Sequence, residues 1–195
     1  MISASPAQLA ASLSVAQVLV ATITPQQWAM PTPCTDWDVH ALVSHVVSGN
    51  QLFAGILTGR TTLAEWRRNP PRDVLGDRPV AAFHDAAQAL VAAFELPNVL
   101  DRAVSVPFGT VPGMVALHLR ITEILTHGWD LARATGRPAP FDNAVVEQEL
   151  QFSLQALTQP PTERTPFAAP TEAPQTATSI DRLAALLGRD VTALD

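Results

Sequence analysis

The feature that most constrains this chain is a long stretch from Pro112 to Gly136 that has no internal proline. From Gly113 it reads GMVALHLRITEILTHGWDLARATG, which predicts one long helix ended by Gly136 and Pro138. Within it, Glu123 and His127 are four residues apart, and a four-residue step returns to nearly the same face of a helix. The two side chains are therefore expected to point the same way, as two ligands of one divalent metal must.

Other segments carry apolar periodicity or capping signals of helices. Ser5 and Pro6 mark one helix start, and Thr35 with Asp38 three residues later resembles a capping box that starts another. We expect helices at 6–22, 35–57, 79–96, 143–157 and 179–187, and a short helical turn at 62–67.

The remaining segments are expected to lack regular structure. Residues 98–112 allow a short extended piece around Val104–Val106, but Pro107 and Gly109 favour a loop, and no alternation in the chain predicts a sheet. Five prolines in 158–177 indicate a segment that wraps the surface. The class is all-α: a four-helix bundle over residues 1–137 and a helical or irregular extension over 138–195, packed together as one domain.

Composition excludes several classes of protein. The net charge of −6 and the absence of an arginine-rich stripe exclude a basic nucleic-acid surface. No apolar run approaches the ~20 residues of a membrane-spanning helix, and the N-terminus lacks the features of a secretory signal. The single cysteine, Cys34, leaves no internal disulfide. We therefore expect a cytoplasmic protein.

A metal held by Glu123 and His127 needs a third ligand, and His45 is the best candidate. His45 falls on the apolar face of the predicted second helix, and ligands on facing helices of a bundle can converge in its core. Two imidazoles and one carboxylate leave a coordination position open, as in catalytic zinc sites, and also suit ferrous iron or nickel. The alternative is that Glu123 pairs with Arg120, His127 lies on the surface and His45 is a hydrogen-bonded core residue.

Several neighbours of this candidate site have alternative interpretations. Asp130, one turn beyond His127, is a weak catalytic candidate that could orient a ligand, or it pairs with Arg133 or is solvated. Cys34 is a possible fourth ligand, although a buried apolar role fits it better because no cation neighbours it in the sequence. Gly128 in mid-helix indicates a close approach of another segment, and the four tryptophans are expected in the core or lining a pocket.

Two motifs give the chain a resemblance to a known family. The first is Thr32-Pro-Cys-Thr-Asp-Trp-Asp-Val39 followed by Leu42 and His45, and the second runs from Glu123 through His127-Gly-Trp-Asp-Leu-Ala-Arg-Ala-Thr-Gly136. Over about residues 6–137 the chain resembles the actinobacterial DinB-like metal-binding proteins related to the N-terminal domain of mycothiol-dependent maleylpyruvate isomerase. The segment Leu183-Ala-Ala-Leu-Leu-Gly-Arg-Asp190 resembles the C-terminal signature of a single-domain branch of that family.

The resemblance implies a DinB-type four-helix bundle with a divalent metal at its core, usually zinc. It assigns the metal to His45, Glu123 and His127. It also implies a low-molecular-weight thiol such as mycothiol as cosubstrate. The isomerase has a second domain after the bundle, for which 138–195 are too few residues, so we do not expect maleylpyruvate isomerisation itself.

Three functions remain open from the sequence, and none of them identifies a substrate. The first is a metal-dependent thiol transferase that acts on a small electrophile. The second is a hydrolase in which the metal activates water, with Asp130 or the peripheral His118 as weak candidates for the base. The third is a metal- or ligand-binding protein without turnover, possibly a homodimer. An open coordination position beside a pocket would favour the enzymes.

Overall fold

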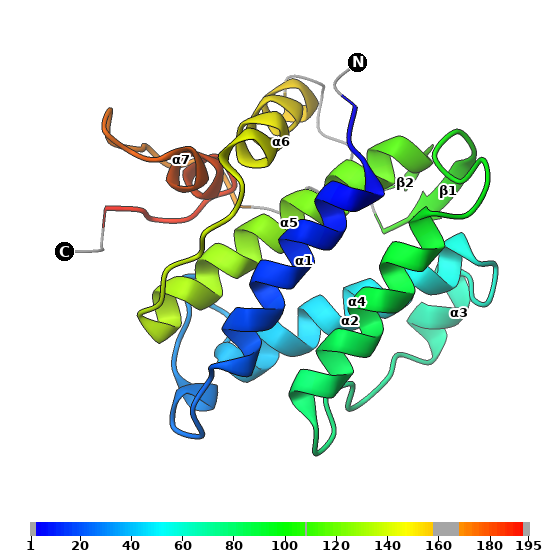
Figure 1. The fold of residues 1–195 in the computed structure, drawn as a ribbon, viewed down its shortest axis with the longest axis horizontal. Coiled ribbons are helices and arrows are strands. Elements are labelled where there is room, and N and C mark those ends of the chain that lie inside the picture. The colour runs from blue at the N-terminus through cyan, green and yellow to red at the C-terminus, as the bar shows by residue number, and fades with distance from the viewer. Residues whose placement is uncertain (1–2, 108, 158–167, 193–195) are drawn as a thin grey trace.

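Four long helices form the bundle in the computed structural model, which describes residues 3–107, 109–157 and 168–192. They are α1 (Pro6–Ala21), α2 (Val39–Leu57), α4 (Pro79–Phe94) and α5 (Gly113–Thr135), and each packs against two of the others (Figure 1). Most side chains of α5 are buried because α1 and α2 of the bundle and two further helices surround it. The prediction of an all-α four-helix bundle is confirmed.

The second helix begins later than its sequence predicted. Asp38 is the N-cap of α2 and accepts a hydrogen bond from the backbone of Ala41, so Thr35 lies outside the helix. The preceding residues form a turn instead, in which the hydroxyl of Thr32 donates to the carbonyl of Trp37 over 2.8 Å. This turn holds Trp37 beside the first turns of α2.

The segment before α5 is a β-hairpin, so the preference for a loop at 98–112 is wrong and the short extended piece that the sequence also allowed is present. Strands β1 (Ala103–Val106) and β2 (Gly109–Pro112) are antiparallel, and Ala103 pairs with Pro112. Val104 and Val106 are buried and alternate with exposed residues, as in a strand with one face on the core. Pro107 follows β1, and Gly109 begins β2 with a φ of 130° and pairs with Val106, so neither residue interrupts the pairing.

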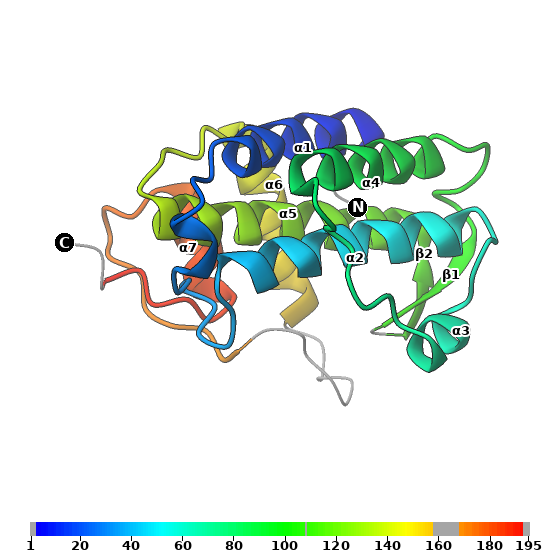
Figure 2. The same ribbon diagram turned by 90° about the horizontal axis from the view of Figure 1, so that it is seen from below.

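The C-terminal helices α6 (Asn143–Leu157) and α7 (Ser179–Leu186) pack against α5 and against each other (Figure 2). Val146, Leu150 and Leu183 belong to the same apolar core as the bundle, so the extension covers α5 rather than hanging free. The division between bundle and extension at residue 137 stays a prediction. Of the segment 158–177 that was predicted to wrap the surface, residues 158–167 lie outside the described residues.

Shorter elements complete the fold. A single 3-10 turn, η1 (Gln27–Ala29), follows α1, and α3 (Leu63–Arg68) follows α2 close to the helical turn that was predicted there. The hairpin and α3 lie at one end of the bundle and α7 at the other (Figures 1 and 2). None of the helices in the described residues combines the length and the apolar character that crossing a bilayer requires.

Candidate metal centre

The three side chains singled out in the sequence meet between α2 and α5. His45, Glu123 and His127 each offer a donor atom, and these atoms lie within 4.8 Å of one another. The closest pair is His45 Nε2 and Glu123 Oε2, at 3.3 Å, and the two imidazole rings lie nearly edge to face with centroids 5.0 Å apart. In the described part of the chain this is the one group of potential metal ligands of its kind.

The donor set and its spacing fit a divalent cation. Zinc–ligand bonds of about 2.1 Å in a tetrahedral arrangement place ligand atoms about 3.4 Å apart. The distance between His45 Nε2 and Glu123 Oε2 is close to that value, and no two donor atoms of the group are more than 4.8 Å apart. Two imidazole nitrogens and one carboxylate are common zinc ligands and leave a position for a further ligand.

Glu123 is also held by Arg120, as the alternative interpretation of the sequence expected. Arg120 Nη1 donates to Glu123 Oε2 over 3.1 Å, so the same carboxylate oxygen faces both the guanidinium and His45. Burial opposes ionisation of Glu123, but the hydrogen bond with His45 and the charge of Arg120 lower the pKa of this carboxyl well below its usual value. The carboxylate is therefore ionised at neutral pH, as binding of a cation requires.

Arg120 is itself buried against α2. A side chain at Gly49 would overlap its guanidinium, which lies 5.1 Å from the centre of the Phe53 ring. Its Nη2 donates to Asn50 Oδ1 over 2.7 Å, while Arg120 Nε and Asn50 Nδ2 have no protein partner. Arg120 is therefore part of the site as well as the partner of Glu123, because it is buried and lines the cavity above the donors.

His127 is oriented from behind by Asp130. Its Nδ1 lies 3.1 Å from Asp130 Oδ2, and a carboxylate can only accept, so Nδ1 carries a proton and the lone pair of the neutral ring, which a metal would use, is on Nε2. Burial disfavours the charge of Asp130, but hydrogen bonds from His127 and Arg189 lower the pKa of the carboxyl below its usual value. The suggestion that Asp130 could orient a ligand agrees with this contact.

The cation that pairs with Asp130 comes from the C-terminal extension. Arg189 donates through Nε over 3.1 Å and through Nη2 over 2.8 Å, so it holds both carboxylate oxygens of Asp130. The prediction that Asp130 pairs with Arg133 is wrong, because Arg133 forms a salt bridge with Asp181 near the start of α7. Arg189 belongs to the family-like C-terminal signature, but it is 59 residues from Asp130 in the sequence, and no local pattern predicts that the two are in contact.

Trp37 packs against both histidines. Its ring centre is 4.4 Å from that of His45 and 5.7 Å from that of His127, so the indole limits how far either imidazole can turn. Trp37 therefore lines the site, as predicted for the tryptophans as a group.

A cavity of about 370 Å³ lies over the three donors, and we call it the donor cavity. Its other walls come from the turn before α2, from α2, α3 and α5, from the residue after β1 and from the C-terminal extension: Cys34, Trp37, Ser48, Gly49, Leu52, Phe53, Trp66, Pro107, Arg120 and Arg189. Burial raises the pKa of the Cys34 thiol despite the nearby charge of Arg189, so this thiol is neutral at neutral pH. Its sulfur is not among the donor atoms of the group formed by His45, Glu123 and His127.

Two further residues from the sequence analysis lie elsewhere. His118 is buried, not peripheral: its Nδ1 donates to Glu149 on α6, and it does not line the donor cavity. Gly128 lies under the ring of Phe141, which a side chain at this position would overlap, so the predicted close approach is confirmed.

Comparison with known proteins places the chain in a family. The model of the mycothiol maleylpyruvate isomerase N-terminal domain matches residues 9–132. Two uncharacterized proteins of Mycobacterium tuberculosis, Rv0738 of strain H37Rv and MT0763 of strain CDC 1551, are each 34% identical over 176 residues, which cover 89% of this chain and 91% of the relative.

A solved structure supports the same fold. The crystal structure of a mutant of mycothiol-dependent maleylpyruvate isomerase matches with a TM-score of 0.57 at 12% identity, over 76% of this chain and 67% of that one. At this identity the likeness shows the fold alone, and the family rests on the sequence comparisons. Together with the helical bundle around α5, they show that the chain belongs to the mycothiol maleylpyruvate isomerase N-terminal domain family.

Proposed function

We propose that His45, Glu123 and His127 bind one divalent metal ion and that the protein uses it to transfer a low-molecular-weight thiol, such as mycothiol, to a small electrophile in the cytoplasm. The observation that carries this is the convergence of three donor atoms within 4.8 Å at the floor of a cavity. Zinc is the first choice of metal, with nickel or iron as alternatives, because ligand type alone does not select among them.

The chain's own residues prepare this site for a thiol. Glu123 supplies one negative charge, and Asp130 keeps Nε2 of His127 free for coordination. A divalent cation bound there lowers the pKa of a coordinated thiol enough to deprotonate it. The apolar side chains of Leu52, Phe53 and Trp66 in the wall restrict water beside the reacting sulfur.

The reaction would be a nucleophilic substitution or addition at an electrophilic carbon, with the thiol sulfur as the nucleophile. The thiol would release its proton to the solvent, and a lone pair of the resulting thiolate would form a bond to an electrophilic carbon. The electron pair of the bond that breaks would pass to a leaving group or, in an addition, to the neighbouring atom of a double bond, which then takes a proton from water.

The site gives less support to the other two functions. A hydrolase needs a general base beside the attacking water, but Asp130 is held behind His127 by Arg189, and His118 is engaged with Glu149. A purely structural metal would be closed by a fourth protein ligand, and no further potential ligand joins the three within the described residues.

Thiol binding to the zinc-loaded protein tests this proposal. Calorimetry with N-acetylcysteine or mycothiol in two buffers of different ionisation enthalpy is expected to show binding with release of about one proton per thiol. The variant His45→Ala should lose this signal, and His84→Ala, which removes an exposed histidine of α4 bonded to Gln17, should keep it. No heat with either thiol at millimolar concentration would reject the transferase.

The salt bridge behind His127 gives a separate prediction. Arg189→Gln is expected to lower zinc affinity by about 10–100-fold, because Asp130 loses the partner that fixes it against His127. Competition with a chromogenic chelator measures the affinity. The matched control is Arg182→Gln, which removes an exposed arginine bonded to Glu147. If Arg189→Gln lowers the melting temperature but leaves zinc affinity unchanged, Arg189 has only a structural role.

A further inference from the structure

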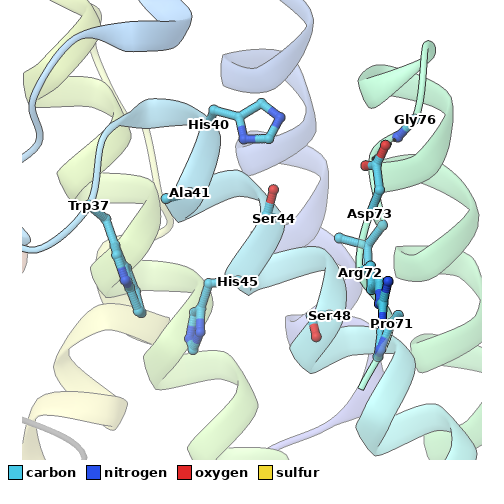
Figure 3. Close-up of a pocket in the computed structure, with 11 residues that line it drawn as sticks. Trp37, His40, Ala41, Ser44, His45, Ser48, Pro71, Arg72, Asp73 and Gly76 are labelled. Carbon is cyan, nitrogen blue, oxygen red and sulfur yellow. Dashed lines mark hydrogen bonds between the residues drawn. The ribbon is translucent and has the colours of Figure 1, made fainter. Parts of the chain in front are cut away.

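A second hollow lies on the other side of His45, between the first half of α2 and residues 71–76, which link α3 to α4. Its volume is about 450 Å³, within the range of about 300–1,000 Å³ for small-molecule sites, and we call it the polar hollow. His40, Ser44 and Ser48 form one wall at four-residue intervals along α2, and Figure 3 shows them facing the linking segment. Within the described residues, neither serine hydroxyl has a protein hydrogen-bond partner.

The opposite wall carries Arg72 and Asp73 (Figure 3). Asp73 is fixed because its Oδ1 accepts the backbone N–H groups of Leu75 and Gly76, and these hydrogen bonds lower the pKa of its carboxyl. Leu75 is buried in the core and anchors the segment. The hollow therefore presents a guanidinium, an imidazole, two hydroxyls and a carboxylate that backbone hydrogen bonds hold in place.

The polar hollow and the donor cavity share a wall. Trp37, His45 and Ser48 line both of them. A ligand in the polar hollow therefore lies against the imidazole whose Nε2 faces Glu123. In Figure 3, Trp37 and His45 stand side by side at this boundary. One molecule long enough to pass this boundary would reach both spaces.

We propose that the polar hollow binds the polyhydroxylated part of the thiol cosubstrate, a sugar or cyclitol, while its sulfur reaches the three donors; this rests on the proposed function. Hydroxyl groups of a sugar both donate and accept, and they match the carboxylate, guanidinium and serine groups of the two walls. The charge of Arg72 is offset by Asp73, so the hollow suits a neutral polyol better than a phosphate. The indole of Trp37 offers an apolar face for a sugar ring.

The donor cavity has the complementary character. Leu52, Phe53 and Trp66 give it apolar walls that suit a small electrophile, whereas the polar hollow is bounded by exposed Arg72 and Asp73, where a polyol can stay partly hydrated. Mycothiol has this two-part chemistry, because it joins an N-acetylcysteine to a glucosamine linked to inositol. The donor cavity would thus hold the sulfur end of the thiol, and the polar hollow would hold its polyol end.

Calorimetry with three probes tests the proposal on native protein and on Ser44→Leu, which fills the polar hollow. The matched control is Ser14→Leu on the exposed face of α1. Native zinc-loaded protein is expected to bind mycothiol at least about tenfold more tightly than N-acetylcysteine, as several hydrogen bonds would give. Ser44→Leu should abolish this preference but leave N-acetylcysteine binding unchanged, and Ser14→Leu should keep both.

The third probe, glucosaminyl-inositol without the thiol, separates this inference from the proposed function. Native metal-free protein should bind it, and Ser44→Leu should not. If it fails to bind at millimolar concentration, or mycothiol binds no better than N-acetylcysteine, the sugar site is overturned whatever the thiol does at the metal. If it binds but neither thiol does, the transferase fails and the polyol site stands.

Discussion

Replacing Glu123 by alanine is expected to lower the free energy of unfolding by about 3–5 kcal/mol even without metal, because it leaves a buried charge unpaired. The guanidinium of Arg120 is almost fully buried, and Glu123 is the carboxylate that it contacts, at 3.1 Å. Asn50, its other partner, carries no charge. Chemical denaturation in the presence of a chelator measures this effect apart from any loss of metal.

The control for Glu123→Ala is Glu147→Ala. Glu147 bonds Arg182 and Ser179 at the surface, where an ion pair contributes up to about 1 kcal/mol. A second variant, Arg120→Leu combined with Glu123→Ala, removes both charges and should recover part of the loss. If Glu123→Ala is as stable as Glu147→Ala, Arg120 does not depend on this carboxylate and the electrostatic description of the site is wrong.

Glu149→Ala is expected to have a comparable effect at a place remote from the donor cavity. Glu149 on α6 is fully buried and accepts hydrogen bonds from His118 at 2.9 Å, from Thr122 at 3.1 Å and from Gln148 at 3.0 Å. Its loss removes the acceptor that joins α6 to α5 and should cost about 3–5 kcal/mol. Denaturation measures the total, and amide hydrogen exchange should show α6 losing protection first.

Glu147→Ala again serves as control, because Glu147 lies on the same helix two residues earlier and is only partly buried. Zinc affinity provides an internal check, since Glu149 does not line the donor cavity and folded Glu149→Ala should bind zinc as the native protein does. Equal stabilities of Glu149→Ala and Glu147→Ala would contradict the role of this buried network in docking α6.

The sequence predicted what local periodicity and spacing determine. The long helices follow from apolar residues that recur every three or four positions, and the pair Glu123 and His127 follows from a four-residue step on one of them. His45 is predicted as the third metal ligand because it is a polar side chain on the apolar face of a helix. These inferences needed no knowledge of how the helices pack beyond the assumption of a bundle.

What the sequence could not predict depends on contacts between distant segments. The hairpin at 103–112 is stabilised by pairing and by burial of Val104 and Val106, which outweigh the local loop signals of Pro107 and Gly109. Arg133 is the arginine nearest to Asp130 in the sequence and was the predicted ion-pair partner. In the fold, the chain after α7 passes close to Asp130, so that Arg189 forms this ion pair instead. The polar hollow likewise forms only when residues 71–76 fold back along α2.

The most direct test of the metal site is metal analysis after equilibration with zinc and removal of the excess. Native protein should retain about one zinc ion per chain, and His45→Ala and His127→Ala should retain almost none, because each removes one of three ligands. His84→Ala and His40→Ala, which lie outside the donor set, should match the native protein. Equal zinc in all five proteins would contradict the site formed by His45, Glu123 and His127.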